Sequence, residues 1–392
     1  MAPRRPPRPG QKPGQRAARP AATDDDDEAH AEVSGSAAAS AAAEAPGDAD
    51  GAPAGYSWGD YVEALVAAHG SLAAVAWKLV ERGLAEDAAS VERAIRRLRA
   101  RGQRNGGLVG QRLLRAFGVP AGAEARARWM GLYHSPFGDL PVGLCLDQLR
   151  LWDRPPISES RARAWILLGL AGVALRRRDF ADARAHLDRA ASAAEAPAAR
   201  VEHHLAMAYL TTREHADAAR AEAAARPYLD AARAALEAAR TTPGARDPLA
   251  APGALDPLDA ACFQARLADH EAFAANRRDD HARALALYRA LPAEDVHPFA
   301  SYRRDAGLAY GLFRRGERDE ALALAARACE HAGDGGYVRL RAMGLLMVAR
   351  IQGTPANAPA LARASAIAER LDDAELRLRI ERARKRSYRD ER

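Results

Sequence analysis

Apolar residues recur at helical spacing from Tyr56 onward, and glycines separate the periodic stretches. Three short stretches come first, over residues 57–70, 71–83 and 87–102, the last with Asp87 or Ser90 as its start. Each starts at a serine or aspartate, whose side chain can accept a hydrogen bond from the first helical turn, and each ends at a glycine. Three helices in about 45 residues have the size of a helix-turn-helix unit.

A repeat occupies the second half of the chain, from about residue 160 onward. Four copies place large, small and aromatic residues at matching positions, and their first helices contain Leu167, Leu205, Ala272 and Leu308. Since each copy has room for two helices, the pattern predicts stacked helical hairpins, and residues 336–386 can supply at least one more.

The second and third copies lie further apart than the others. The matching positions Phe180 and His215 are 35 residues apart, whereas His215 and His281 are 66 residues apart. The longer step has room for one further hairpin around residues 228–240, followed by a loop in the Pro- and Gly-rich stretch 241–257. We therefore expect five or six hairpins of about 34 residues each.

This spacing resembles that of the tetratricopeptide repeat, in which small alanines let the two helices of a hairpin cross closely. The resemblance implies an α-solenoid whose concave surface holds a peptide or a partner helix. The alternative is a set of unrelated amphipathic helices, because alanine recurs by chance in so alanine-rich a chain. The first helices of the repeats would line the concave surface, although several of their side chains could instead fill the core between hairpins. The candidate partner-binding residues are His204, Tyr209, Phe273, Asn276 and Tyr310.

The stretches 63–76 and 90–102 resemble a Fis-type DNA-binding module, with a glycine before the second helix and an alanine pair inside it. The resemblance implies that the third helix enters the major groove. Residues 79–90 form a longer connection than the tight turn of that family. A winged-helix variant accommodates this better, with Asn105-Gly106 as the tip of a small hairpin and Leu108-Val109 as its strand.

Arginines gather on this third helix and just after it. Residues 90–115 contain eight arginines and a single acid, Glu92. Guanidinium groups off the apolar stripe could bind phosphates or read guanine in the major groove. The alternative is a solvated helix in an arginine-rich chain, in which only three of the 58 basic residues are lysine. The candidate nucleic-acid-binding residues are Arg93, Arg96, Arg97, Arg101 and Arg104.

Composition and motifs narrow the function classes. Aromatic residues make up only 6% of the chain, which disfavours a large sheet. Cys145 lies far from the other two cysteines, so a disulfide framework is unsupported. The chain has no P-loop and no metal-ligand spacing, so we expect no cofactor and no metal site. A nucleophile and base formed by His134, Asp139 and Cys145 is the weakest hypothesis, because no hydrolase signature has this spacing; aromatic packing at a joint is the alternative.

The chain therefore predicts an all-α protein with a small helix-turn-helix-like unit followed by an α-solenoid of tetratricopeptide-like hairpins. Its expected parts are a disordered tail with a basic and then an acidic run (1–55), the helix-turn-helix-like domain (56–135), a Pro/aromatic connector (136–160), the repeat array (161–386) and a basic tail (387–392). The longest apolar run is too short to span a membrane, so we expect a soluble, cytoplasmic protein.

The expected function is regulatory and not enzymatic. The array would bind a protein or peptide partner, the small module would contact DNA, and the sequence leaves any small-molecule ligand unknown. The alternative is a scaffold or adaptor for protein complexes that binds no nucleic acid.

Overall fold

The structure, a computed structural model, describes residues 55–241, 255–293 and 297–390, without the side chains of residues 241 and 386–390. Over these ranges it contains seventeen α-helices and two short 3-10 helices and no strand, so the prediction of an all-α fold is confirmed. Residues 1–54 of the predicted tail, most of the predicted loop 241–257, and residues 391–392 lie outside this description.

A first helical unit contains α1 (Trp58–His69), α2 (Leu72–Glu81), α3 (Ala88–Arg99) and α4 (Gly107–Phe117). The predicted helix starts are confirmed. Ser57 forms a capping box with Asp60, the Ser71 hydroxyl accepts from the backbone of the first turn of α2, and Asp87 rather than Ser90 caps α3. The apolar faces of the four helices form one core around the fully buried side chains of Trp58 and Ile95.

The predicted wing is wrong, because residues 107–117 form a helix. The Asn105 side chain accepts a hydrogen bond from Gly107 N–H at 2.8 Å, so the Asn-Gly pair leads into a helix and not into a hairpin. Gly106 and Gly110 also have a packing role. A Cβ on Gly110 would lie 2.8 Å from the buried Trp58 ring, so this glycine lets α4 approach α1.

The segment that follows packs on the array. Its helices are α5 (Ala121–Gly131), η1 (Pro136–Asp139), α6 (Val142–Trp152) and η2 (Ile157–Glu159). Both α5 and α6 contact α7, and their apolar side chains belong to the same core as those of the first hairpins. Gly169 of α7 lets α5 cross closely, since a Cβ there would lie 2.6 Å from the carbonyl oxygen of Met130.

Helices pack in sequential pairs through the rest of the chain, as in a helical repeat array. They are α7 (Arg163–Arg177), α8 (Phe180–Ala191), α9 (Pro197–Glu214), α10 (Ala218–Thr241), α11 (Pro257–Arg277), α12 (His281–Arg289), α13 (Pro298–Arg314), α14 (Arg318–Asp334), α15 (Val338–Gln352), α16 (Ala358–Leu371) and α17 (Ala374–Asp390). In each of the five pairs from α7–α8 to α15–α16, the even-numbered helix also contacts the odd-numbered helix that follows it, and the last of these is α17.

The further hairpin expected around residues 228–240 is wrong, because α10 is one continuous helix of 24 residues. Pro227 lies inside this helix without ending it. The physical reason is an apolar stripe that keeps helical spacing along the whole helix, so one face stays buried throughout. The buried residues of this stripe are Ala221, Ala225, Leu229, Ala232, Leu236 and Ala239.

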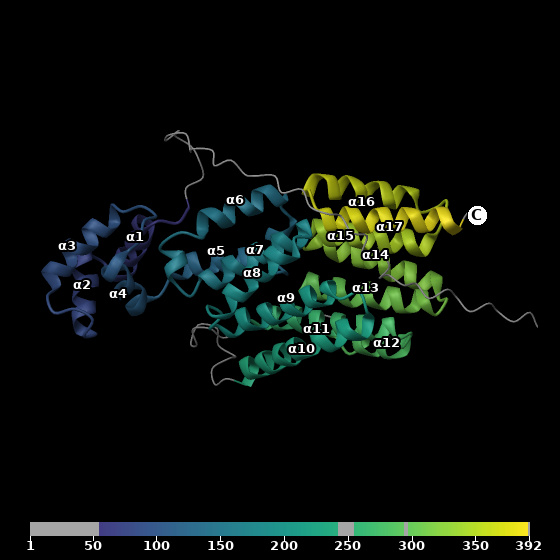
Figure 1. Cartoon of the computed structure of the whole chain (residues 1–392), viewed down its shortest axis with the longest axis horizontal. Coiled ribbons are helices and arrows are strands. Elements are labelled where there is room, and N and C mark those ends of the chain that lie inside the picture. Colours follow the sequence, from purple (N-terminus) through teal and green to yellow (C-terminus); the bar gives the residue numbers. More distant parts are fainter. Residues whose placement is uncertain (1–54, 242–254, 294–296, 391–392) are drawn as a thin grey trace, which may run out of the picture. The chain divides into compact units, whose positions relative to one another are not determined.

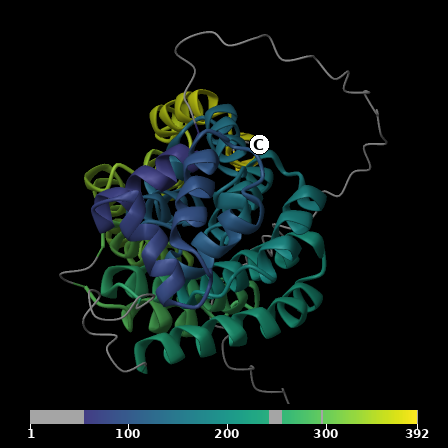
Figure 2. The ribbon, with the colours of Figure 1, turned by 90° about the vertical axis from the view of Figure 1, so that its left-hand side faces the viewer.

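The odd-numbered helices close into a ring. Each of α7, α9, α11, α13 and α15 contacts the next odd-numbered helix, and α17 contacts α7 in turn. Figure 1 shows the yellow α17 with the green helices before it and the blue-green α7, and Figure 2 gives a second view of the same helices. We call α7–α17 the helical ring, with the odd-numbered helices on its inside.

Buried ion pairs join the two ends of the ring. Arg176, at the end of α7, donates to the Asp373 carboxylate at 3.0 Å, and both side chains are at least nine-tenths buried. Arg178 donates to Glu375 of α17 at 2.6 Å. The array therefore returns on itself, a closure that the predicted α-solenoid did not include.

Candidate functional sites on α3 and inside the helical ring

The arginines predicted to bind nucleic acid are exposed. Arg93, Arg96 and Arg97 lie on α3 away from its buried residues Val91 and Ile95. Arg96 is paired with Glu92 of the same helix at 2.5 Å and remains 65% exposed. Within the described residues, none of the three arginines contacts an acid of the helical ring, so the charge of this face is not neutralised by the rest of the fold.

The other two predicted arginines lie in the connection between α3 and α4. Arg101 donates to the carbonyl oxygen of Asn105 at 2.9 Å, and its side chain is exposed. The carbonyl oxygen of Arg104 accepts a hydrogen bond from the Trp58 indole at 2.9 Å, while the Arg104 side chain extends to solvent. The core therefore fixes the backbone of this connection, and both guanidinium groups remain exposed, that of Arg101 with a hydrogen bond to Asn105.

Three of the predicted partner-binding residues are aromatic side chains beside arginines on odd-numbered helices. The Tyr209 ring lies 5.1 Å from the Arg213 guanidinium, and the Tyr310 ring lies 5.1 Å from that of Arg350. Phe273 is 44% exposed.

The other two predicted residues have local contacts. Asn276 binds the His281 ring at 2.9 Å at the turn between α11 and α12, and His204 packs against His203. Among the described residues, no contact joins any two of the five predicted partner-binding residues, so the structure does not bring them together as one cluster.

The sequence analysis missed a cluster of arginines around Tyr133, which follows α5. The Tyr133 hydroxyl accepts hydrogen bonds from Arg303 of α13 at 3.0 Å and from Arg339 of α15 at 3.4 Å. The guanidinium group of Arg266, on α11, lies over the Tyr133 ring at 4.6 Å. A fourth arginine, Arg379 of α17, reaches across to the Tyr209 hydroxyl of α9 at 3.4 Å. We call Tyr133 and these four arginines the Tyr133 cluster.

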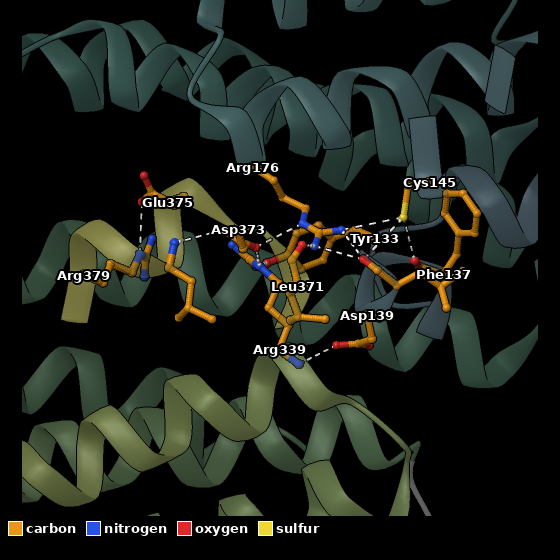
Figure 3. Close-up of polar contacts among 12 residues, drawn as sticks. Tyr133, Phe137, Asp139, Cys145, Arg176, Arg339, Leu371, Asp373, Glu375 and Arg379 are labelled. Carbon is orange, nitrogen blue, oxygen red and sulfur yellow. Dashed lines mark hydrogen bonds and ion pairs between the residues drawn. The ribbon is translucent and has the colours of Figure 1, made fainter. Parts of the chain in front are cut away.

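Carboxylates hold the arginines of this cluster in place. Asp373 accepts from Arg339 at 2.7 Å as well as from Arg176, and Glu375 accepts from Arg379 at 3.0 Å (Figure 3). The guanidinium groups in and around the cluster nevertheless outnumber the four carboxylates that bind them. The arginines are Arg176, Arg178, Arg213, Arg266, Arg303, Arg339 and Arg379, and the acids are Glu202, Asp269, Asp373 and Glu375.

The excess positive charge changes the protonation equilibria of the cluster. Burial alone would raise the pKa of Tyr133, but the charges of Arg303, Arg339, Arg266 and Arg379 outweigh it and lower that pKa to about 8. Burial likewise opposes the ionisation of Asp373, yet Arg339 and Arg176 hold the pKa of this carboxyl below its ordinary value. Negative charge is thus stabilised inside the ring.

Asp139 has the opposite environment. Its carboxylate accepts from the Arg339 backbone N–H at 2.5 Å, but burial dominates and raises the pKa of Asp139 to about 6.

His134, Asp139 and Cys145, which the sequence offered as a nucleophile and base, do not form one site. His134 binds Asp259 at 2.8 Å instead of Asp139, and the Cys145 thiol donates to the carbonyl oxygen of Phe137 at 3.3 Å. Burial raises the pKa of Cys145, which disfavours the thiolate that a nucleophile needs. His134 and Asp259 line a separate cavity of about 370 Å³ together with His297.

Two further features of the described part of the chain concern metal ligands and membrane-spanning helices. These residues hold no group of three or more His, Cys, Asp or Glu side chains placed to bind a metal ion. No single described helix is long and apolar enough to cross a membrane; α1 and α2 together reach that length only with a bend of 82°, and their apolar faces form the core of the first helical unit.

Comparisons of the chain with protein-family models, with curated proteins and with solved structures find no match. One signal in the sequence could have located the Tyr133 cluster: Arg266, Arg303 and Arg339 are 37 and 36 residues apart, close to the repeat length of about 34 residues. The odd-numbered helices of three successive hairpins thus each supply an arginine to the inside of the ring.

Proposed function

We propose that this protein is a regulatory protein that contacts DNA through α3 and binds a partner through its helical array. In this proposal α1–α4 are a helix-turn-helix-like module and the hairpins of the ring are tetratricopeptide-like repeats. The second assignment is supported by the sequential pairing of helices and by alanines at crossing positions, such as Ala309 and Ala321, which are fully buried.

The exposed arginine face of α3 is the observation that carries the DNA contact. Arg93, Arg96 and Arg97 extend from a helix that the core holds on its other side. In the described part of the chain, Glu92 pairs with Arg96, and Glu63 pairs with Arg99 of the same helix. Each guanidinium that binds a phosphate releases condensed counterions, which makes such binding strongly dependent on salt.

The partner would contact the aromatic–arginine pairs of the odd-numbered helices. Tyr209, Phe273 and Tyr310 combine a flat apolar ring with a neighbouring positive charge. Such pairs suit a peptide that has both apolar and acidic residues.

Binding of the full chain to a labelled random DNA duplex, followed by fluorescence anisotropy from about 50 to 200 mM salt, tests the DNA contact. We expect affinity to fall steeply with salt, and the Arg93→Ala/Arg96→Ala/Arg97→Ala variant to have a slope smaller by about 2 to 3 units, at about 0.9 per phosphate lost.

The matched control removes three exposed arginines from the even-numbered helices, in the variant Arg220→Ala/Arg283→Ala/Arg289→Ala. This variant has the same change in net charge and should bind DNA like the unmodified chain. If the two triple variants weaken DNA binding equally, the effect comes from net charge and not from α3. If the unmodified chain binds no DNA at low salt, the scaffold function is the better account.

A further inference from the structure

The inside of the helical ring keeps part of its polar surface in contact with solvent. Tyr133 is surrounded by side chains of α11, α13 and α15 and is still 41% exposed. Arg379 and Asp269 are also partly exposed.

The arginines of the cluster also retain donor capacity. A guanidinium group has five N–H donors in a fixed planar fork. Arg303 uses its two terminal nitrogens for Asp269 and Tyr133, while its Nε is buried and has no hydrogen-bond partner. Unsatisfied donor capacity therefore remains beside Tyr133, as it does at the buried Nε of Arg128 and of Arg304 elsewhere in the described residues.

The charge balance favours an anion. Seven arginines pair with four carboxylates in and around the cluster, and Asp139 beside Arg339 is a fifth acid. The arginine charges hold the pKa of Tyr133 near 8, although desolvation of the phenol opposes this. The same field that stabilises a phenolate stabilises any negative group placed beside the hydroxyl.

We propose that the Tyr133 cluster is a binding site for a small molecule that carries two or more phosphate or carboxylate groups. The arginine forks match the paired oxygens of both groups, and arginines from α11, α13, α15 and α17 would hold separate anionic groups of one ligand. This site does not depend on the DNA contact of α3. Because the contacts come from four helices, such a ligand would join α17 to α11, α13 and α15.

Isothermal titration calorimetry of the full chain with inorganic pyrophosphate and, separately, with citrate tests the proposal. Saturable binding of pyrophosphate alone assigns a phosphate ligand, binding of citrate alone assigns a polycarboxylate, and binding of both assigns either group. Absence of heat from both probes at millimolar concentration overturns the proposal.

Variants then locate the bound anion. Arg379→Gln removes a partly exposed arginine whose partner Glu375 keeps Arg178 and Arg213, so the fold should tolerate it. We expect at least tenfold weaker binding. Arg377→Gln, on the same helix but exposed and paired with Asp372, is the matched control and should bind normally.

Two further measurements test the site even if Arg379→Gln does not fold. The α3 triple variant removes the other candidate anion surface and should bind the probe normally; loss of binding there would move the anion to α3 and overturn the proposal. A bound anion should also neutralise the arginines around Tyr133 and raise the pKa of its phenol by at least half a unit, measured by ultraviolet absorbance. An unchanged titration at saturating probe contradicts the site.

Discussion

At the scale of single residues, Tyr133 responds most directly to the charges around it. Its hydroxyl accepts hydrogen bonds from two arginines, and a third lies over its ring. Spectrophotometric titration of the unmodified chain at 295 nm should therefore show one tyrosine that ionises near pH 8, about two units below a free phenol. The Tyr133→Phe variant should lack this step and keep the other transitions. A titration identical in both proteins would contradict the positive field assigned to the cluster.

The buried Asp139 carboxyl should make the free energy of unfolding depend on pH in the opposite direction to most carboxyl groups. Burial raises its pKa to about 6 in the folded state, so folding favours its protonated form. Its contribution to the free energy of unfolding is therefore present below about pH 4 and is lost as the pH rises through about 6.

The measurement is urea denaturation of the unmodified chain and of Asp139→Asn at several pH values. The stability difference between the two proteins should change by no more than about 3 kcal/mol between pH 4 and pH 7, in favour of the variant at the higher pH. A difference that stays constant over this range would show that Asp139 has an ordinary pKa.

At the scale of elements, the packing of α4 on α1 depends on a glycine. An alanine methyl at Gly110 would lie 2.8 Å from the ring of Trp58, which is fully buried and has no room to move away. Gly110→Ala should lower the free energy of unfolding by about 1 to 3 kcal/mol, as overpacking does. Gly122→Ala is the control, since nothing lies within 4 Å of that Cβ and alanine favours helix; it should be neutral or stabilising. Equal effects of both changes in urea denaturation would contradict the close approach.

Local signals predicted most of the helices, because a cap or a periodic face is contained in a few neighbouring residues. Ser57 and Ser71 start helices as expected, and the apolar stripe of α3 is buried. The wing failed at Gly106 for a non-local reason: the residue that requires a small neighbour there is Trp58, about fifty positions earlier. The Tyr133 cluster needs four helices to meet, and only the ring closure, which no local pattern contains, brings Arg379 to α9.

At the scale of the whole molecule, Asp373 joins the two ends of the ring. It is fully buried and accepts from Arg176 of α7 and Arg339 of α15. Asp373→Ala removes the carboxylate that pairs with the buried Arg176 and the partly buried Arg339, so the free energy of unfolding should fall by about 3 to 5 kcal/mol.

The neighbouring Asp372 supplies the control. Its side chain is 66% exposed, and its backbone is left-handed with φ of 50°, a conformation that asparagine tolerates. Asp372→Asn should therefore unfold at nearly the same urea concentration as the unmodified chain. Because Arg339 and Arg176 lower the pKa of Asp373, its contribution is present above about pH 4 and is lost on acidification, so the Asp373→Ala deficit should shrink at low pH. A deficit that does not change with pH would indicate a loss of packing and not of charge.

Ring closure also limits how this protein can change its length. An open solenoid gains or loses repeats at its ends at little cost, since each repeat contacts only its neighbours. Here α17 contacts α7, so a duplicated or deleted hairpin would separate Arg176 from Asp373 and leave charged groups without partners. The closed geometry therefore fixes the number of hairpins. Over evolution, the sequence of this array should change by substitution and by changes in loop length, and not by the gain or loss of whole repeats.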